Sequence, residues 1–479
     1  RRIVVGGKGR VAAGRRSYKN RGGAPLLLYW RPFGMLGVVM GAAADLIVHA
    51  RWVIPVEGSG PLSDHALVVR DGLIADILPS DQADSRWRAT RTLHLGQHAL
   101  LPGFVNAHTH TAMNLFRGLA DDLALMTWLE KHIWPAEGQW VRDEFVHDGT
   151  RFACAEMIRG GTTCFADMYF FPEAIARAAK EAGLRASIFS PLLDFPTPMA
   201  QGPEEYLRLA ISAHDNWRHE PLIQIGFGPH APYTVSDGPL ARVLTLAEEL
   251  DLPIMMHVHE TAGEIMMATT DGGPRPLERL HALGLLGPRL LAVHMTQLSD
   301  DEIALLARTG VSVVHCPESN LKLASGFCPV EKLRQAGVNV ALGTDGSASN
   351  NDLDMPGEMK TAALLAKAVA QDAAALPAAA ALEMATLNGA RALGLDSQIG
   401  SLVIGKQADM IALDLGAVET QPLYDPVAQI VYSASRQQVT HTFVAGRALM
   451  EDRVLLTLNE ARVLRDARTW GDRIRGAQA

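Results

Sequence analysis

Two histidines one residue apart, His108 and His110, close the segment LPGFVNAHTH at residues 101–110. Side chains at positions i and i+2 of a β-strand point to the same face, so two imidazoles at this spacing can bind one metal ion. Such a pair needs further ligands from later in the chain. If His, Glu and Asp recur at the ends of later strands, the pattern indicates a metal-dependent hydrolase, and otherwise the pair has no chemical meaning.

Polar side chains do recur at the ends of later candidate strands. A single histidine there is more often structural, but repetition at several consecutive strand ends favours a metal site. Three neutral imidazoles and one carboxylate leave a divalent ion with a net positive charge and an open position, which acidifies bound water. A base must then take the second proton, a role that suits Asp345, and an acid must protonate the electron-accepting atom, which suits Glu260. The recurring side chains are His230 in GFGPHAPYT, His257, His259 and Glu260 in LPIMMHVHE, His294 in LLAVHMT, and Asp345 in VALGTDGSASNND.

Residues 100–396 alternate short apolar runs with amphipathic stretches, the pattern of successive βα units around a parallel sheet. Eight strand candidates predict a (β/α)₈ TIM-like barrel, in which catalytic groups sit at the C-terminal ends of the strands. An open doubly wound sheet is the alternative, and the lack of an early GxGxxG weakens it. The expected strands are 100–108, 162–168, 185–191, 222–228, 253–259, 289–294, 311–315 and 338–344, and helices are expected at 239–250, 300–309, 361–381 and 460–475.

The two ends of the chain share a β-rich texture with turns at Gly and Asp-Gly. We therefore expect residues 41–99 and 397–455 to form one small composite β-sandwich, followed by a C-terminal helix at 456–479. Residues 1–40 hold nine Lys or Arg and no acidic residue. We interpret them as a disordered or non-native extension, with Met40 as a plausible natural start.

Composition excludes several classes of function. The part of the chain after residue 40 holds 52 acidic against 35 basic side chains, which does not favour nucleic acid as a partner. No apolar run is long enough to predict a transmembrane helix. The four cysteines form no CxxC pair, so we expect reduced core residues rather than disulfides or a thiolate metal site. We expect a cytoplasmic homo-oligomer.

The motifs PGFVNAHTH, GGTTCFADMY, GFGPHAPYT, HVHE, HCPESNLKLASG and GTDGSASNN resemble the amidohydrolase superfamily, in particular its 5′-methylthioadenosine/S-adenosylhomocysteine deaminases. The resemblance covers residues 44–455. It implies that His108, His110, His257 and Asp345 are metal ligands, that Glu260 is the proton shuttle, and that His294 orients the attacking water or helps accept its proton.

Two choices follow from this resemblance. The family places its ligand three residues before the glutamate, which selects His257 and leaves His259 structural. Two-metal members carry a bridging lysine after the fourth strand, where this chain has His230, so we expect one divalent ion. Zinc is the expected metal, although iron, nickel and cobalt also suit three histidines and one aspartate.

The resemblance also implies substrate contacts. Glu137, in WLEKHIWPAEGQW, matches the family carboxylate that accepts hydrogen bonds from the ribose, and His230 matches a nucleoside contact. Trp128 and Trp134 are expected in the core, with stacking on the base as the alternative. We expect Ser319, Asn320 and Lys322 near the pocket.

One departure from the family concerns the amino-acid tail of S-adenosylhomocysteine. Members that bind this tail can place an arginine near the end of the third strand, where this chain has Ser190-Pro191, and Arg208 lies outside any matching motif. We therefore expect the neutral 5′-methylthioadenosine to be a better substrate than S-adenosylhomocysteine, whose amino-acid tail is charged.

We predict hydrolytic deamination of the adenine ring of 5′-methylthioadenosine and/or S-adenosylhomocysteine, with adenosine as a further substrate. Water attacks C6, Glu260 protonates N1, and Asp345 and His294 handle the protons of the water. The alternative keeps the site but takes a free base such as an oxidised guanine, or an s-triazine. A non-catalytic scaffold would show eroded ligands, and every ligand position is filled.

Overall fold

The computed structural model describes residues 41–478. The interpretation of residues 1–40 as a disordered or non-native extension lies outside the described residues. Within the described range, no helix has the length and apolar character that crossing a bilayer requires.

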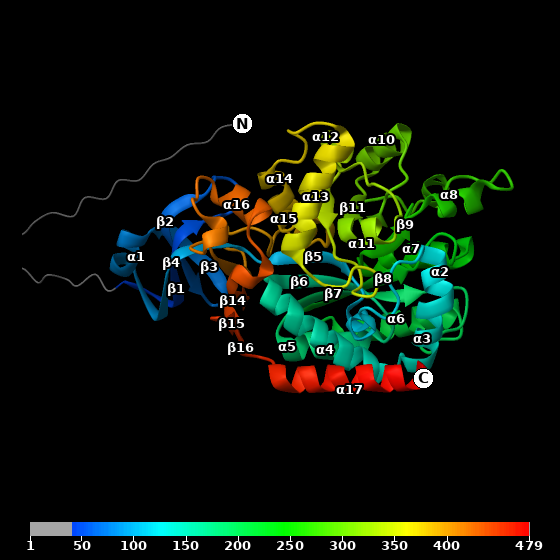
Figure 1. Cartoon of the computed structure of the whole chain (residues 1–479), viewed down its shortest axis with the longest axis horizontal. Coiled ribbons are helices and arrows are strands. Elements are labelled where there is room, and N and C mark those ends of the chain that lie inside the picture. The colour runs from blue at the N-terminus through cyan, green and yellow to red at the C-terminus, as the bar shows by residue number, and fades with distance from the viewer. Residues whose placement is uncertain (1–40, 479) are drawn as a thin grey trace, which may run out of the picture. The chain divides into compact units, whose positions relative to one another are not determined.

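The core of the protein is an eight-stranded parallel sheet in which the strands follow one another in chain order (Figure 1). The first and last strands meet through an isolated bridge between Thr109 and Asp345. The Asp345 N–H also donates to the carbonyl oxygen of His108 at 3.0 Å. The barrel predicted from the sequence is thus confirmed, and all eight expected strands are present: β5 Phe104–Thr109, β6 Thr162–Met168, β7 Arg185–Leu192, β8 Ile223–Pro229, β9 Ile254–Val258, β10 Leu290–His294, β11 Ser312–His315 and β12 Val340–Leu342.

Closure of the barrel depends on a glycine. A Cβ atom at Gly343, directly after β12, would lie 2.8 Å from both the backbone nitrogen and the Cβ of His108. That distance is well inside van der Waals contact, so a side chain here would push β12 away from β5. The Gly of the GTDG motif therefore sets the approach that brings Asp345 beside His108.

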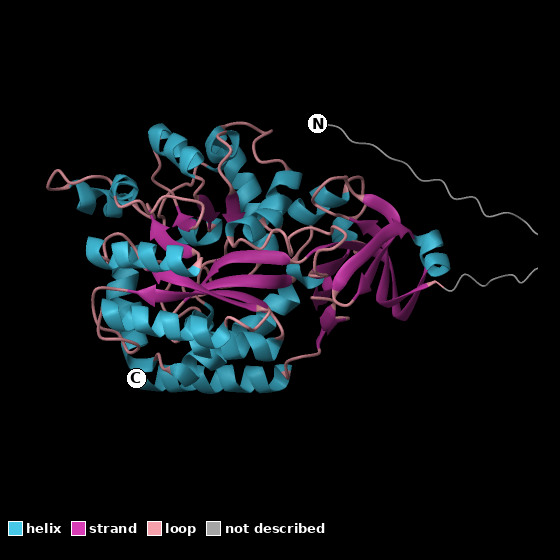
Figure 2. Cartoon of the chain, turned by 180° about the vertical axis from the view of Figure 1, so that it is seen from behind, coloured by secondary structure: helices cyan, strands magenta, loops and turns pink. Residues whose placement is uncertain are grey.

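Helices cover the outside of the parallel sheet (Figure 2). Helix α10 spans the residues predicted for it and starts after a capping box. In this box the Ser299 hydroxyl accepts the Glu302 N–H, and the Glu302 carboxylate accepts the Ser299 N–H. The helices are α2 Leu125–Trp128, α3 Trp134–Trp140, α4 Asp143–Gly160, α5 Pro172–Ala182, α6 Pro203–Trp217, α7 Asp237–Leu250, α8 Ala262–Thr269, α9 Pro276–Ala282, α10 Asp300–Thr309, α11 Pro317–Lys322, α12 Val330–Gln335, α13 Met355–Ala370, α14 Ala378–Met384, α15 Leu387–Ala392, α16 Pro426–Tyr432 and α17 Glu460–Gln478.

The single helix expected at 361–381 is wrong. Helix α13 ends at Ala370, because Gln371 adopts the left-handed conformation with φ 51°, and α14 starts after Pro377. The alanine-rich composition on both sides of this break conceals it from a propensity argument.

The two ends of the chain together build a second, mixed sheet of eight strands. Strands β1 and β4 pair in parallel and β4 pairs with β13 antiparallel, which joins the N-terminal and C-terminal strands. The composite β-structure predicted from both ends is therefore confirmed, while the exact domain boundaries stay a proposal. Its strands are β1 Ala42–Val53, β2 Leu62–Arg70, β3 Leu73–Pro79, β4 Trp87–Pro102, β13 Met410–Asp414, β14 Val439–Val444, β15 Arg447–Glu451 and β16 Val454–Leu455, and α1 Ser80–Arg86 lies between β3 and β4.

A buried ion pair links the mixed sheet to the barrel. The Arg185 guanidinium at the start of β7 donates to both carboxylate oxygens of Asp409 at 3.1 and 3.3 Å. The Asp409 carboxylate also accepts the Ala445 N–H at 2.7 Å. Both residues are buried, so removing either partner would leave an unpaired charge in the interior. The connection between the mixed sheet and the barrel is therefore costly to break.

Candidate active site

Four side chains meet at the carboxyl ends of the barrel strands. The His257 Nε2 lies 3.2 Å from the His108 Nε2. The Asp345 Oδ1 lies 3.4 Å from the His108 Nε2 and 3.3 Å from the His110 Nε2. Tetrahedral zinc with bonds of about 2 Å separates its ligand atoms by roughly 3.3 Å, so these spacings suit one ion.

The hydrogen bonds of these imidazoles turn their Nε2 lone pairs toward one another. Nδ1 of His110 donates to the Met168 carbonyl at 2.6 Å, and Nδ1 of His257 donates to the His230 carbonyl at 2.8 Å. The Nε2 atoms of neutral rings held in this way are bare acceptors. Two acceptors in contact repel each other unless a cation lies between them, which is the arrangement that a metal site requires.

Burial and charge shift the pKa values of the cluster in opposite directions. Burial lowers the pKa of His108 to about 4 and the pKa of His257 well below its usual range. Burial also lowers the pKa of His110, but the Asp345 carboxylate outweighs it and raises that pKa to about 9. A divalent cation would take the place of this proton, because metal ligation needs the neutral ring.

Two hydroxyls fix the orientation of the Asp345 carboxylate. Ser319 and Ser349 donate to its Oδ2 at 2.6 and 2.8 Å, which leaves Oδ1 facing the histidines. Burial raises the pKa of Asp345, but hydrogen bonds from His108 and His110 hold it well below the usual range. The carboxylate is therefore ionised and aimed at the cluster.

Glu260 follows β9 and is held through its backbone. Its N–H donates to the Glu264 carboxylate at 2.9 Å, and its carbonyl accepts the Thr296 hydroxyl at 2.7 Å. The residue is 8% exposed, and burial raises the pKa of its carboxyl. A buried carboxyl with a raised pKa holds a proton more readily than a free one, as a proton shuttle requires.

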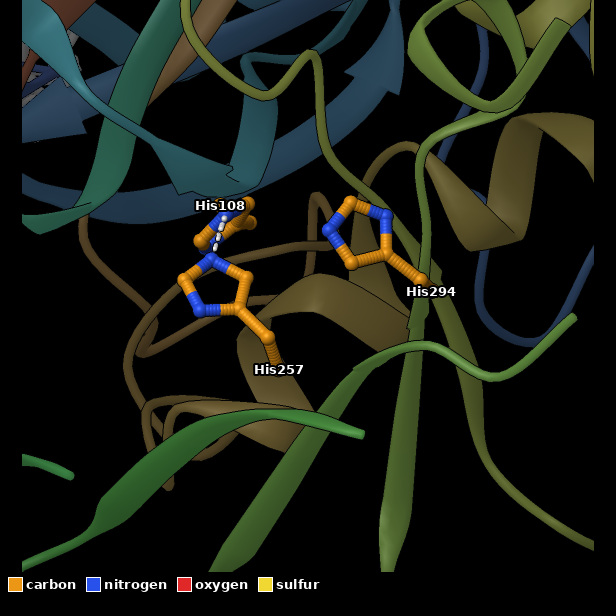
Figure 3. A group of neighbouring side chains, drawn as sticks. All are labelled: His108, His257 and His294. Carbon is orange, nitrogen blue, oxygen red and sulfur yellow. Dashed lines mark hydrogen bonds between the residues drawn. The ribbon is translucent and has the colours of Figure 1, made fainter. Parts of the chain in front are cut away.

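His294 lies beside this cluster (Figure 3). Its Nδ1 donates to the Asn320 Oδ1 at 2.9 Å, so Nε2 is free, 3.8 Å from the Glu260 carboxylate. His108, His257 and His294 also come within 4.8 Å of one another through their nitrogens, which makes His294 an alternative ligand. The ring centroid of His294 is 6.0 Å from that of His108, whereas the ring centroid of His257 is 4.9 Å from it, so His294 lies farther from His108 than His257 does.

His259 lies apart from the cluster. Its Nε2 accepts the Leu277 N–H at 3.2 Å, and it lies 3.9 Å from Glu302. Residues i and i+2 of a strand point to the same face, but this rule does not apply to His257 and His259, because β9 ends at Val258. His259 has left-handed backbone, φ 54°, and its side chain does not join that of His257.

The cluster forms the floor of a cavity of about 280 Å³. Glu137 lines this cavity from α3 and accepts the Tyr169 hydroxyl at 2.7 Å, and burial raises its pKa to about 7. His230 also lines it, with Nδ1 3.0 Å from the Thr234 hydroxyl and a pKa lowered by burial to about 4. Trp128 and Trp134 both border the cavity, and Trp128 is in addition part of the core.

The three residues expected at the pocket do not line the cavity. Ser319 and Asn320 lie next to it and hydrogen-bond Asp345 and His294, respectively. Lys322 pairs with Asp121 at 2.6 Å. Arg208, which matched no family motif, is exposed on α6 and pairs with Glu205.

The sequence reasoning missed the residues that support the site. Asp167 in the FADMY motif accepts hydrogen bonds from the Thr109 hydroxyl and from both the N–H and the hydroxyl of Thr111, and so fixes the chain around His110. Tyr169 and Glu264 were also missed. Only Asp167 and Tyr169 had a signal, since both lie in a motif already singled out.

Comparisons with known proteins show the family of the chain. The family model described as "Amidohydrolase family" matches residues 99–449. A 5-methylthioadenosine/S-adenosylhomocysteine deaminase of Saccharophagus degradans is 53% identical over 91% of this chain and 98% of its own length, and one of Teredinibacter turnerae is 48% identical over 90% and 98%.

Solved structures of similar fold were also found. A zinc-bound adenosine deaminase of Xanthomonas campestris is 52% identical with a TM-score of 0.90, covering 91% of this chain and 100% of that chain. An atrazine chlorohydrolase of Arthrobacter aurescens, at 21% identity and a TM-score of 0.83 over 89% of this chain and all of that one, shares the fold. The chain belongs to the amidohydrolase family and, within it, groups with the 5-methylthioadenosine/S-adenosylhomocysteine deaminases.

Proposed function

We propose that the protein hydrolytically deaminates the adenine ring of 5′-methylthioadenosine and related adenine nucleosides, with one divalent metal ion, zinc being the expected one. The observation that carries this proposal is that His110, His257, His294, Glu260 and Asp345 all line one cavity, with His108 buried against the same cluster. Relatives that are 40–53% identical over most of the chain bear the name of this activity.

His108, His110, His257 and Asp345 would hold the ion, which when bound supplies the positive charge that acidifies water. The remaining steps belong to side chains of the protein. Glu260 holds a proton in its buried carboxyl and delivers it to N1 of the adenine ring as water adds at C6. Asp345 and His294 take up the two protons that the water gives away. One proton passes to the amino group, which leaves as ammonia, and the other restores the proton of Glu260.

Glu137 provides the nucleoside contact in this proposal. Its carboxylate lies in the cavity wall and has one described partner, the Tyr169 hydroxyl on Oε1. The second oxygen is available to the hydroxyls of a ribose. A free base offers no such hydroxyls, so Glu137 favours a nucleoside over a guanine derivative or a triazine.

The cavity wall also bears on the choice between nucleosides. None of the described residues that line it is Lys or Arg, and the wall includes apolar residues such as Phe170, Leu193 and Phe195. A carboxylate in such a wall has no cation to pair with, and burying it unpaired is costly. The apolar methylthio group therefore fits better than the amino-acid tail of S-adenosylhomocysteine.

Ammonia release measured with methylthioadenosine, S-adenosylhomocysteine, adenosine, guanine derivatives and a chlorotriazine tests this proposal, with metal content determined on the same sample. We expect methylthioadenosine to give the highest kcat/KM, roughly tenfold or more above S-adenosylhomocysteine. Ammonia from guanine derivatives alone, or chloride from the triazine without ammonia from any nucleoside, would contradict it.

A further inference from the structure

A second cavity, of about 310 Å³, is lined by arginines and shares no lining residue with the catalytic one. It lies where α4, α17, the 3-10 turn Arg436–Gln438 and the turn between β15 and β16 come together. Figure 1 and Figure 2 both show α17 running along α4. Its charged lining residues are Arg117, Arg159, Arg436, Arg453, Glu156 and Glu460.

Two of the four arginines are neutralised by acidic side chains. Arg436 donates to Glu156 at 3.0 Å and lies 3.5 Å from Asp352 and 3.7 Å from Asp354. Arg117 pairs with the other oxygen of the same Glu156 carboxylate. The positive charges of Arg117 and Arg436 are therefore already compensated by carboxylates.

In the other two arginines, each side chain donates to the backbone carbonyl of the other residue, and their charges have little compensation. Nη1 of Arg159 donates to the Arg453 carbonyl at 3.0 Å, and Nη1 of Arg453 donates to the carbonyls of Val439 at 2.7 Å and Arg436 at 3.0 Å. Arg453 has no carboxylate within ion-pair distance among residues 41–478, and Arg159 has only the half-exposed Glu460 at 3.4 Å. The Nε and Nη2 groups of both arginines have no hydrogen-bond partner within the described part of the chain.

Backbone carbonyls thus hold two positive charges together at the wall of a cavity. Burial lowers the pKa of Arg453 and the charge of Arg159 lowers it further, while the Glu460 carboxylate raises it and offsets only part of the shift. A doubly charged oxyanion would relieve this repulsion. The planar fork of a guanidinium matches the oxygens of a phosphoryl group, which makes phosphate the natural partner of paired arginines.

We propose that Arg159 and Arg453 form a binding site for a phosphoryl dianion, either inorganic phosphate or a small phosphate monoester, separate from the catalytic centre. The proposal is independent of the function assigned to the catalytic cavity. The two sources differ only in the group beyond the phosphoryl oxygens, which the remaining volume of the cavity can accept.

The test is calorimetric titration of the full-length, metal-loaded protein with inorganic phosphate and with glycerol 3-phosphate, at constant ionic strength kept with chloride. We expect saturable binding of one anion per chain and affinity reduced roughly tenfold or more in Arg159→Gln and in Arg453→Gln. Arg475→Gln is the matched control, because Arg475 lies on α17, pairs with Asp472 and does not line the cavity. Tighter binding of the ester would identify a phosphorylated metabolite as the ligand, and equal or weaker binding would identify phosphate itself.

The Arg453 side chain donates to three backbone carbonyls, so the Arg453→Gln variant can fail to fold. The decisive variant is therefore Arg159→Gln, because the Arg159 side chain is 32% exposed. Unchanged affinity in Arg159→Gln, or no saturable binding by the wild-type protein, would overturn the proposal. So would binding that disappears when the metal is removed but survives in Arg159→Gln, because the anion would then occupy the catalytic centre.

Discussion

Two regions of this protein are rich in histidine, and only one of them has the geometry of a site. In the mixed sheet, His49 and His94 lie opposite each other on β1 and β4 with ring centroids 4.6 Å apart, and His98 and His441 meet edge to face at 6.2 Å. In the barrel, His108, His110 and His257 turn their Nε2 atoms toward one carboxylate or one another. Proximity of imidazoles alone therefore does not distinguish the two regions.

The difference lies in where the histidines sit on their strands. Histidines in the middle of the mixed sheet stand side by side and perpendicular to it, so their nitrogens have no common target. Histidines at the ends of barrel strands point inward from a ring, and their lone pairs converge. In the barrel, His294 and Asp345 have left-handed backbone, with φ 76° and φ 60°, whereas none of the four histidines compared in the mixed sheet does.

The largest effect is expected from removing one converging imidazole. His257→Asn should lose most of the metal and nearly all ammonia release, because the shorter amide cannot place a ligand atom where the imidazole nitrogen lies. His441→Asn, in the mixed sheet, should keep both. Metal content by elemental analysis and activity on the same samples check this, and equal metal loss in the two variants would erase the distinction.

Glu260→Gln should retain the metal but lose turnover by about 10²–10⁴-fold, because the amide cannot carry the proton to N1. Elemental analysis and single-turnover kinetics separate binding from chemistry. Wild-type kcat in this variant would remove Glu260 from the mechanism.

Glu137→Gln should lower kcat/KM for nucleosides by roughly ten- to a hundredfold, since the charged acceptor for the ribose hydroxyls is gone. The raised pKa of Glu137, about 7, adds a pH signature. The carboxyl is protonated below that pH and ionised above it, so kcat/KM of the wild type should rise as pH increases through about 7. A pH profile of the glutamine variant that still shows this limb would assign the titration to another group.

Ser319→Ala removes one of the two hydroxyls that orient Asp345, and metal affinity should fall about ten- to a hundredfold. Ser401→Ala is the matched change outside the barrel, where the hydroxyl bonds Glu57 at 2.8 Å. Competition with a chelator measures both, and we expect the second variant to match the wild type. Equal affinity of all three proteins would show that Ser349 alone suffices.

Asp409→Asn should leave kcat and metal affinity unchanged while lowering the free energy of unfolding by about 3–5 kcal/mol, because Arg185 would keep a buried, unpaired charge. Denaturant unfolding of the metal-loaded protein measures this. A drop in kcat without a change in stability would mean that the mixed sheet influences the site directly.

The sequence predicted the barrel well because every strand of a parallel sheet is a buried apolar run, and each of the eight runs became a strand. The sequence also predicted that the residues of the cluster come together, because they follow strands whose carboxyl ends meet at one edge of the sheet. It did not reveal the break between α13 and α14, where alanine favours helix on both sides, nor the partners of Asp345 and His294. Those partners come from α11 and from the segment after β12, and a single sequence carries no signal for which hydroxyl or amide turns inward.

The bond between the Asp345 N–H and the His108 carbonyl joins the first barrel strand to the last. During synthesis, His108, His110 and His257 leave the ribosome long before Asp345 does. A nascent chain that stops short of β12 therefore has three of the proposed ligands but neither the fourth nor a closed ring to hold them. The proposed metal centre can be assembled only when the barrel is complete, so we expect a truncated chain to be inactive.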